Sequence, residues 1–145
     1  ENHPEIAGIV AINAAVAPQQ PEVIDMVKGM VGEGAKVMPG IGSDIAKPGI
    51  VESAYADTPL EPLLSLIGAV EEIGGRLGDI ACPVLIMTSP QDHVVDPAAS
   101  DLLAANVTGP VERVTLERSY HVATLDYDAE LIQEKAVEFA EKVTT

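Results

Sequence analysis

An acidic residue and a histidine lie in two polar loops that each follow an apolar segment. Asp92 lies in the loop 88–97, and His121 lies in the loop 117–126. A buried carboxylate that binds one imidazole nitrogen fixes the tautomer in which the other nitrogen can take a proton from a nucleophile. The two residues therefore indicate the acid and the base of nucleophilic catalysis, if the fold brings their loops together.

These two residues and their neighbours also have simpler structural interpretations. Asp92 could be a turn residue, since aspartate is common in turns for conformational reasons, and His121 could be a half-buried structural histidine. We expect a structural role for His93, because it directly follows Asp92 and could not easily receive the orienting bond of that carboxylate. Ser43 and Ser89 lack the strand, turn and helix setting that exposes a nucleophilic serine, so neither is expected to attack a substrate.

Three segments with continuous or alternating apolar residues predict strands. They span residues 6–13, 83–88 and 111–116. Apolar spacing and helix-start residues predict helices over 63–77, 96–106 and 128–143. Strands that alternate with helices pair in parallel through right-handed crossovers, which makes the fold class α/β. Loops at the carboxyl ends of such strands gather at one edge of the sheet, where the acid and the histidine could meet.

Aspartates precede two of the predicted helices. Asp96 is expected to be an N-cap, with Pro97 as the first helical residue. Asp126 and Asp128 are expected to prepare the last helix, where carboxylates interact favourably with the helix dipole.

The segment 19–62 differs in texture from the rest of the chain. Prolines and glycines punctuate it, so it has room only for short helices and little core of its own. We expect it to be an insertion between a core segment at 1–18 and a longer core segment at 63–145.

Two stretches of the sequence resemble a known enzyme family. Residues 91–95 (Gln-Asp-His-Val-Val) and 119–128 (Ser-Tyr-His-Val-Ala-Thr-Leu-Asp-Tyr-Asp) are similar to the acid and histidine loops of α/β-hydrolases, specifically bacterial carboxylesterases and monoacylglycerol lipases. The similarity extends through 82–83 and back to 41–44 and 52–55, so it covers nearly the whole chain.

The resemblance implies particular roles for residues and segments. Asp92 would be the acid of a catalytic triad, and His121 would be its base. The insertion 19–62 would be a small cap that closes over the acyl and glycerol sites. Within it, Glu52 would contact the glycerol moiety, and Ile41 would shape the same pocket. A carboxylate suits a diol because each hydroxyl can donate a hydrogen bond to it.

The chain departs from the family pattern at the nucleophile. These enzymes attack the ester with a serine in a G-x-S-x-G turn, and no such motif occurs in residues 1–145. The resemblance therefore implies that the serine and the oxyanion-hole loop lie upstream of Glu1. We expect this chain to be the C-terminal part of the hydrolase fold, with three parallel strands, flanking helices and a cap. It would be inactive without the missing N-terminal half.

Composition excludes several other classes of protein. The chain has 23 acidic and 8 basic residues, a net charge of −15, which repels nucleic acid and anionic lipid. It has no apolar stretch near the roughly 20 residues needed to span a bilayer. A single cysteine, Cys82, implies no oxidising compartment, so we expect a cytoplasmic protein. The three histidines show no metal-ligand spacing, and we expect no cofactor.

The sequence thus predicts a serine hydrolase that acts on carboxylic esters, with monoacylglycerol as the favoured small-molecule substrate. Two alternatives stay open. One is an α/β-hydrolase relative without a nucleophile that serves as a binding module. The other keeps the fold and catalyses thioester hydrolysis or acyl transfer.

Overall fold

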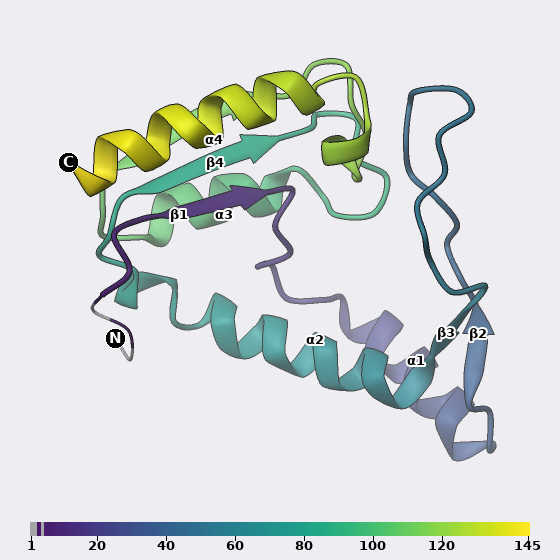
Figure 1. The fold of residues 1–145 in the computed structure, drawn as a ribbon. Helices are drawn as coiled ribbons and strands as arrows, with labels where there is room; N and C mark the ends of the chain where they lie inside the picture. Colours follow the sequence, from purple (N-terminus) through teal and green to yellow (C-terminus); the bar gives the residue numbers. More distant parts are fainter. Residues whose placement is uncertain (1–2, 4) are drawn as a thin grey trace.

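The core of the molecule is a parallel sheet of three strands (Figure 1). The computed structural model describes residue 3 and residues 5–145. Its sheet contains β1 (Ile9–Ile12), β4 (Val84–Thr88) and β5 (Val111–Thr115), in the order β1–β4–β5. Both outer strands run parallel to β4. This arrangement confirms the predicted α/β class with three parallel strands.

The central strand is buried on both faces. Residues 84–87 of β4 are each at most 2% exposed. Alternate side chains of the strand point to opposite faces, so one set packs against α3 (Ala98–Asn106) and the other packs against α4 (Ala129–Thr144). Full burial of each large apolar side chain contributes about 1.5–3 kcal/mol. This strand therefore anchors the sheet and fixes the start of the loop that carries Asp92.

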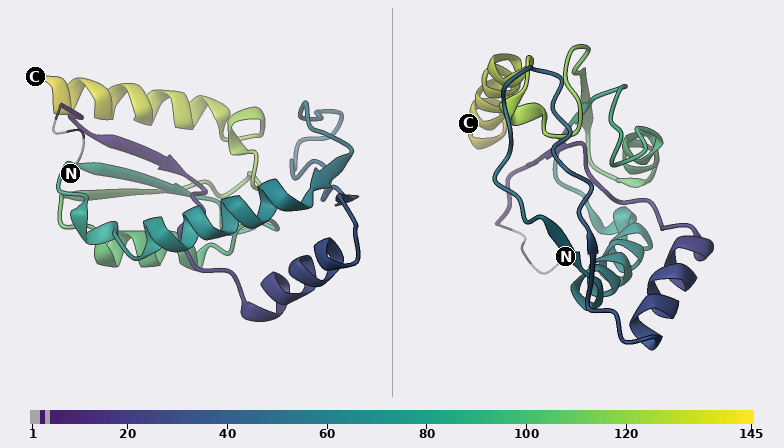
Figure 2. Two further views of the ribbon diagram at one scale, coloured as in Figure 1. Left: turned by 90° about the horizontal axis from the view of Figure 1, so that it is seen from below. Right: turned by 90° about the vertical axis from the view of Figure 1, so that its right-hand side faces the viewer.

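A long segment of helices and a hairpin joins β1 to β4. Its elements are, in chain order, α1 (Pro21–Gly32), β2 (Val37–Pro39), β3 (Asp57–Pro59), α2 (Leu60–Gly74) and the short helix η1 (Leu77–Asp79). A second short helix, η2 (Ala123–Leu125), lies between β5 and α4. The loop 40–56, between β2 and β3, extends beyond the carboxyl ends of the core strands (Figures 1 and 2). None of the helices in the described part of the chain is long and apolar enough to cross a membrane.

This segment is more regular than its prolines and glycines suggested. α1 has 12 residues, more than the short helices expected. Pro21 does not interrupt it, because it occupies a first-turn position where its missing N–H is not needed. β2 and β3 form an antiparallel pair that the sequence did not predict. Pro39 and Pro59 lie at the ends of these two strands, where a missing ladder N–H is tolerated. α2 begins at Leu60 rather than at 63, because the Leu60 side chain is fully buried and extends the packed face of the helix.

β1 is an edge strand within the described residues. It pairs with β4 on one side, and no other strand of residues 3 and 5–145 pairs with its second side. Ile6 and Val10 are exposed near this edge. The sequence predicted a longer first strand, over 6–13, but parallel pairing covers only Ile9 to Ile12.

Candidate active site

The loops after β4 and β5 bring an aspartate and a histidine together. Asp92 Oδ2 lies 2.8 Å from Nδ1 of His121. The Asp92 side chain is 1% exposed, whereas the His121 side chain is 30% exposed. The structure thus places side by side the two residues that the sequence predicted as acid and base, with the acid buried behind the base.

Backbone amides hold the buried carboxylate in position. The second oxygen of Asp92, Oδ1, accepts hydrogen bonds from the N–H groups of Val94 and Val95, each at 2.8 Å. These donors lie in the same loop as Asp92, so the loop itself orients the carboxylate and leaves Oδ2 for His121. A carboxylate at Nδ1 favours a proton on that nitrogen and leaves Nε2 as the proton acceptor.

Asn13 connects the ends of the three strands. It follows β1, and its side-chain oxygen accepts a hydrogen bond from the N–H of Ser89, which follows β4, at 2.8 Å. Its amide nitrogen donates to the carbonyl oxygens of Tyr120 and His121, in the loop after β5, at 3.3 and 2.9 Å. Asn13 has a φ of 46°, a left-handed conformation that asparagine adopts more readily than most residues. The backbone of the histidine loop is therefore fixed to the sheet by a buried amide.

Ser89 and Ser43 form hydrogen bonds with backbone groups, although Ser89 lies only a few residues before Asp92 in the sequence. Ser89 is fully buried and donates its hydroxyl to the carbonyl oxygen of Tyr120 at 3.0 Å. Ser43 accepts a hydrogen bond from the N–H of Glu52 at 3.2 Å, within the loop 40–56. Neither hydroxyl is bonded to the His121 ring.

Asp44, from the loop 40–56, contacts both candidate catalytic loops. Its Oδ2 accepts hydrogen bonds from the N–H groups of His93 and His121, at 3.1 and 3.0 Å. Its Oδ1 lies 2.8 Å from Nδ1 of His93. The His93 ring also makes an edge-to-face contact with Tyr120, with 4.6 Å between ring centroids. His93 is therefore held between two loops, as expected for a structural residue.

Asp126, at the end of the histidine loop, accepts hydrogen bonds from the same insertion that carries Asp44. Its carboxylate accepts hydrogen bonds from the N–H groups of Ala46 and Lys47, and also from those of Tyr120 and Tyr127. The sequence predicted that Asp126 would prepare the last helix. That expectation was wrong for its side chain, because four backbone donors from two loops surround it and only its carbonyl oxygen faces the start of α4.

Asp128 precedes α4, as predicted, but its carboxylate bonds elsewhere. It accepts hydrogen bonds from the N–H of Arg118 and the hydroxyl of Ser119, at 2.9 and 2.8 Å. Asp96 was expected to be the N-cap of α3 with Pro97 as its first helical residue, but Pro97 itself is the N-cap. The Oδ1 of Asp96 still accepts the N–H of Ala98 at 2.9 Å. The helix itself begins at Ala98 rather than at 96.

The carboxylates of Asp44 and Asp126, which join the insertion to the histidine loop, are stabilised in their ionised form. Burial alone raises the pKa of Asp44, but hydrogen bonds from the His121 N–H and from the ring and N–H of His93 together hold that pKa below its ordinary value. Burial likewise raises the pKa of Asp126, and the four backbone donors outweigh it and lower that pKa. Both groups are therefore negatively charged at neutral pH.

A small cavity connects the candidate base with the residues predicted to bind substrate. His121, Ile41 and Glu52 all line this cavity of about 320 Å³, together with Val94 and further residues of the β2–β3 hairpin. Ile41 is 76% exposed, so its apolar side chain has little cover in this chain. The structure thus gathers the two predicted substrate-binding residues and the predicted base along one opening, with Asp92 behind His121.

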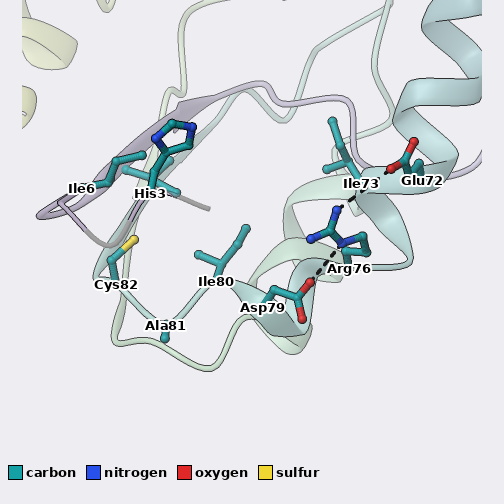
Figure 3. Close-up of a pocket in the computed structure, with 10 residues that line it drawn as sticks. His3, Ile6, Glu72, Ile73, Arg76, Asp79, Ile80, Ala81 and Cys82 are labelled. Atoms are coloured by element: carbon teal, nitrogen blue, oxygen red, sulfur yellow. Dashed lines mark hydrogen bonds and ion pairs between the residues drawn. The ribbon is translucent and has the colours of Figure 1, made fainter. Parts of the chain in front are cut away.

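A larger cavity, of about 760 Å³, lies at the other end of the strands (Figure 3). Ile6 and Ile9 line it from the side of β1, and Cys82 lines it just before β4. Arg76, another lining residue, binds Asp79 at 3.0 Å. Neither Asp92 nor His121 lines this cavity, and in the described residues no three His, Cys, Asp or Glu side chains gather where a metal ion could bind. The smaller cavity, which His121 lines, is therefore the candidate substrate site.

Asn13 and Asp44 both hydrogen-bond to the histidine loop, and sequence reasoning missed both contacts. Asn13 follows a predicted strand, and a polar residue at the carboxyl end of a strand is a signal for such a position. Asp44 lies in the short sequence Gly-Ser-Asp of the insertion, and its contact with His121 depends on how the insertion folds back.

Two proteins with related sequences are a monoacylglycerol lipase and a carboxylesterase. The chain is 41% identical over 145 residues to a thermostable monoacylglycerol lipase of Bacillus sp. (strain H-257), a match that covers 98% of this chain and 56% of that protein. It is 24% identical over 90 residues to a carboxylesterase of Bacillus subtilis (strain 168), covering 61% of this chain and 37% of that protein. No family model matches the chain.

Solved structures lead to the same group. A structure from a study of LipS and LipT, two metagenome-derived lipolytic enzymes, has a TM-score of 0.89 and 38% identity, and the match covers 97% of this chain and 58% of that one. The crystal structure of Paleococcus ferrophilus monoacylglycerol lipase has a TM-score of 0.65 at 16% identity, which supports the fold alone. The chain spans somewhat more than half the length of the monoacylglycerol lipase of strain H-257 and of each of these two solved structures.

Proposed function

Because this chain belongs to the monoacylglycerol lipase and carboxylesterase family of α/β-hydrolases, we propose that it supplies the acid and the base of a serine ester hydrolase. The observation that supports these roles is the buried Asp92 carboxylate, 2.8 Å from Nδ1 of the half-buried His121. In this proposal the nucleophilic serine and the oxyanion hole come from a segment outside residues 1–145. Residues 1–18 and 63–145 form part of the hydrolase core, and residues 19–62 form the cap.

The reaction proceeds in two stages, each with one proton taken and one proton given. His121 Nε2 takes the proton of the serine hydroxyl as the serine oxygen attacks the ester carbonyl, and then gives that proton to the leaving alcohol. Water repeats the cycle on the acyl-enzyme and releases the fatty acid. Asp92 stays ionised throughout and stabilises the imidazolium, since its other oxygen is already held by two backbone N–H groups.

Monoacylglycerol is the proposed substrate class. Glu52 lies on the cavity that His121 also lines, so its carboxylate can accept hydrogen bonds from the free hydroxyls of a glycerol moiety. Ile41 lines the same cavity and contributes an apolar wall. This arrangement favours a glycerol ester over the ester of a simple alcohol with the same acyl chain.

The test uses the full-length protein expressed from its gene. We expect wild type to hydrolyse monoacylglycerols, and His121→Ala to lower kcat at least a thousandfold. Asp25→Asn, an exposed change on α1, serves as the matched control and leaves kcat unchanged. Full activity in a folded His121→Ala variant would remove the base from this mechanism.

The substrate class is tested by Glu52→Ala. We expect the ratio of kcat/KM for a monoacylglycerol over kcat/KM for the matching methyl ester to fall about tenfold, the effect of one lost hydrogen bond to a charged group. An unchanged ratio would show that Glu52 does not recognise glycerol.

A further inference from the structure

Asp44 is a residue of the insertion whose carboxylate bridges both candidate catalytic loops. One oxygen, Oδ2, accepts the N–H of His93, which directly follows the acid Asp92, and the N–H of the base His121. The distances are 3.1 and 3.0 Å. A single atom of the insertion thus fixes the backbone at the acid and at the base.

Further hydrogen bonds fix the segment around Asp44 to the histidine loop. The carbonyl oxygen of Asp44 accepts the N–H of Val122 at 3.1 Å. Asp126 accepts the N–H groups of Ala46 and Lys47, at 2.6 and 2.9 Å. Residues 44–47 therefore lie fixed against the histidine loop and provide a rigid support for the Asp44 carboxylate.

The ion pair between Asp44 and His93 does not account for this arrangement. The His93 side chain is 61% exposed, and exposed ion pairs contribute little to stability. The Asp44 side chain is only 15% exposed, and its Oδ2 is used by backbone donors rather than by the ring. The buried bridge between two loop backbones is the more specific feature.

We propose that Asp44 is a positioning residue, which holds the acid loop and the histidine loop at the separation that lets Asp92 bind His121. The proposal rests on the ester-hydrolase function proposed above. It assigns to the insertion a role in assembling the catalytic pair, in addition to any contact with substrate. Because displacement of a catalytic group by about 1 Å can cost about a hundredfold in rate, a bridge of this kind acts mainly on kcat.

The bridge is tested with Asp44→Ala and Asp44→Asn in the full-length protein. Alanine removes both acceptor oxygens, so we expect kcat to fall by about ten- to a hundredfold while KM changes less than about threefold. Asparagine keeps one oxygen for the two backbone donors but loses the charge that strengthens them, so we expect kcat to fall by about three- to tenfold. Asp25→Asn is again the matched control.

A second readout separates positioning from general loss of structure. The proton on Nδ1 of His121, shared with Asp92, gives a downfield imidazole resonance in proton NMR, and we expect Asp44→Ala to broaden or shift it. If Asp44→Ala does not fold, the Asp44→Asn variant decides the matter. Values of kcat within twofold of wild type in the folded variants, with an unchanged resonance, would overturn the proposal.

The control His121→Ala distinguishes failure of this inference from failure of the proposed function. An active wild type, an inactive His121→Ala variant and fully active Asp44 variants would reject the bridge and keep the ester hydrolase. An inactive wild type, or an active His121→Ala variant, would reject the function on which the bridge depends.

Discussion

Replacing Asp92 by asparagine tests the geometry of the proposed catalytic pair, because the structure determines which way the new amide must point. Oδ1 of Asp92 accepts two backbone N–H groups, from Val94 and Val95. The oxygen of an asparagine must take that place, since an amide NH₂ cannot accept hydrogen bonds. The NH₂ group then faces Nδ1 of His121 and forces the proton onto Nε2. Nε2 can no longer accept the proton of a nucleophile.

The size of the effect follows from these contacts. Turning the amide to restore the productive tautomer breaks two backbone hydrogen bonds, each worth about 1 kcal/mol. Loss of the carboxylate also removes a charge-assisted hydrogen bond to the imidazolium, worth about 1.5–3 kcal/mol. The total of about 3.5–5 kcal/mol corresponds to a fall in kcat of roughly several hundredfold to several thousandfold, at 1.36 kcal/mol for each tenfold change.

The assay compares kcat for monoacylglycerol hydrolysis by full-length wild type, Asp92→Asn and Asp96→Asn. Asp96 lies in the same loop, and its Oδ1 accepts the N–H of Ala98 just at the start of α3. Asparagine can keep this hydrogen bond, so we expect its variant to be unaffected. Nitrogen NMR shifts of His121 report its tautomer independently of activity. A folded Asp92→Asn variant with kcat within tenfold of wild type would refute the reasoning.

Three further predictions concern stability of the full-length protein. Gly109→Ala places a Cβ 2.1 Å from the carbonyl oxygen of Cys82, so we expect the free energy of unfolding in urea to fall by about 1–3 kcal/mol. Its control is Gly68→Ala, in open space on α2, which we expect to raise that free energy by about 0.5–1 kcal/mol. Asn13→Ala loses the hydrogen bonds that join three strand ends and keeps a left-handed φ, so we expect a loss of about 2 kcal/mol; a thermal midpoint equal to wild type would contradict this. The pKa of Asp126 is lowered in the folded protein, so its ionised carboxylate contributes stability above the unfolded aspartate pKa of about 3.9, and this contribution is lost as pH falls through the folded pKa. Asp126→Asn lacks this titrating group, so we expect its stability to fall less than that of wild type between neutral pH and about pH 3.

The contact between Asp92 and His121 could be predicted from the sequence because both residues depend on local signals. Each follows an apolar segment that forms a buried or half-buried strand, and parallel strands bring such loops to one edge of the sheet. The surrounding residues also resemble known acid and histidine loops. Local patterning therefore placed Asp92 and His121 in loops that the structure joins at 2.8 Å.

The residues that support this pair could not be predicted in the same way. Asp44 reaches His121 only because the loop 40–56 folds back over the strand ends, a tertiary arrangement that its proline- and glycine-rich sequence does not reveal. Asp126 was expected to prepare α4, because an acidic residue before a helix usually favours its dipole, yet backbone donors at 46–47 occupy its carboxylate. The hairpin of β2 and β3 was missed because its strands have three residues each and contain proline.

Labelling of the full-length protein with a serine-directed phosphonate tests the central claim most directly. We predict one phosphonylated serine, located by mass spectrometry upstream of residue 1, and a labelling rate at least a hundredfold lower in His121→Ala. Labelling of Ser43 or Ser89, or a rate that does not depend on His121, would contradict the account of this chain as the supplier of the acid and the base.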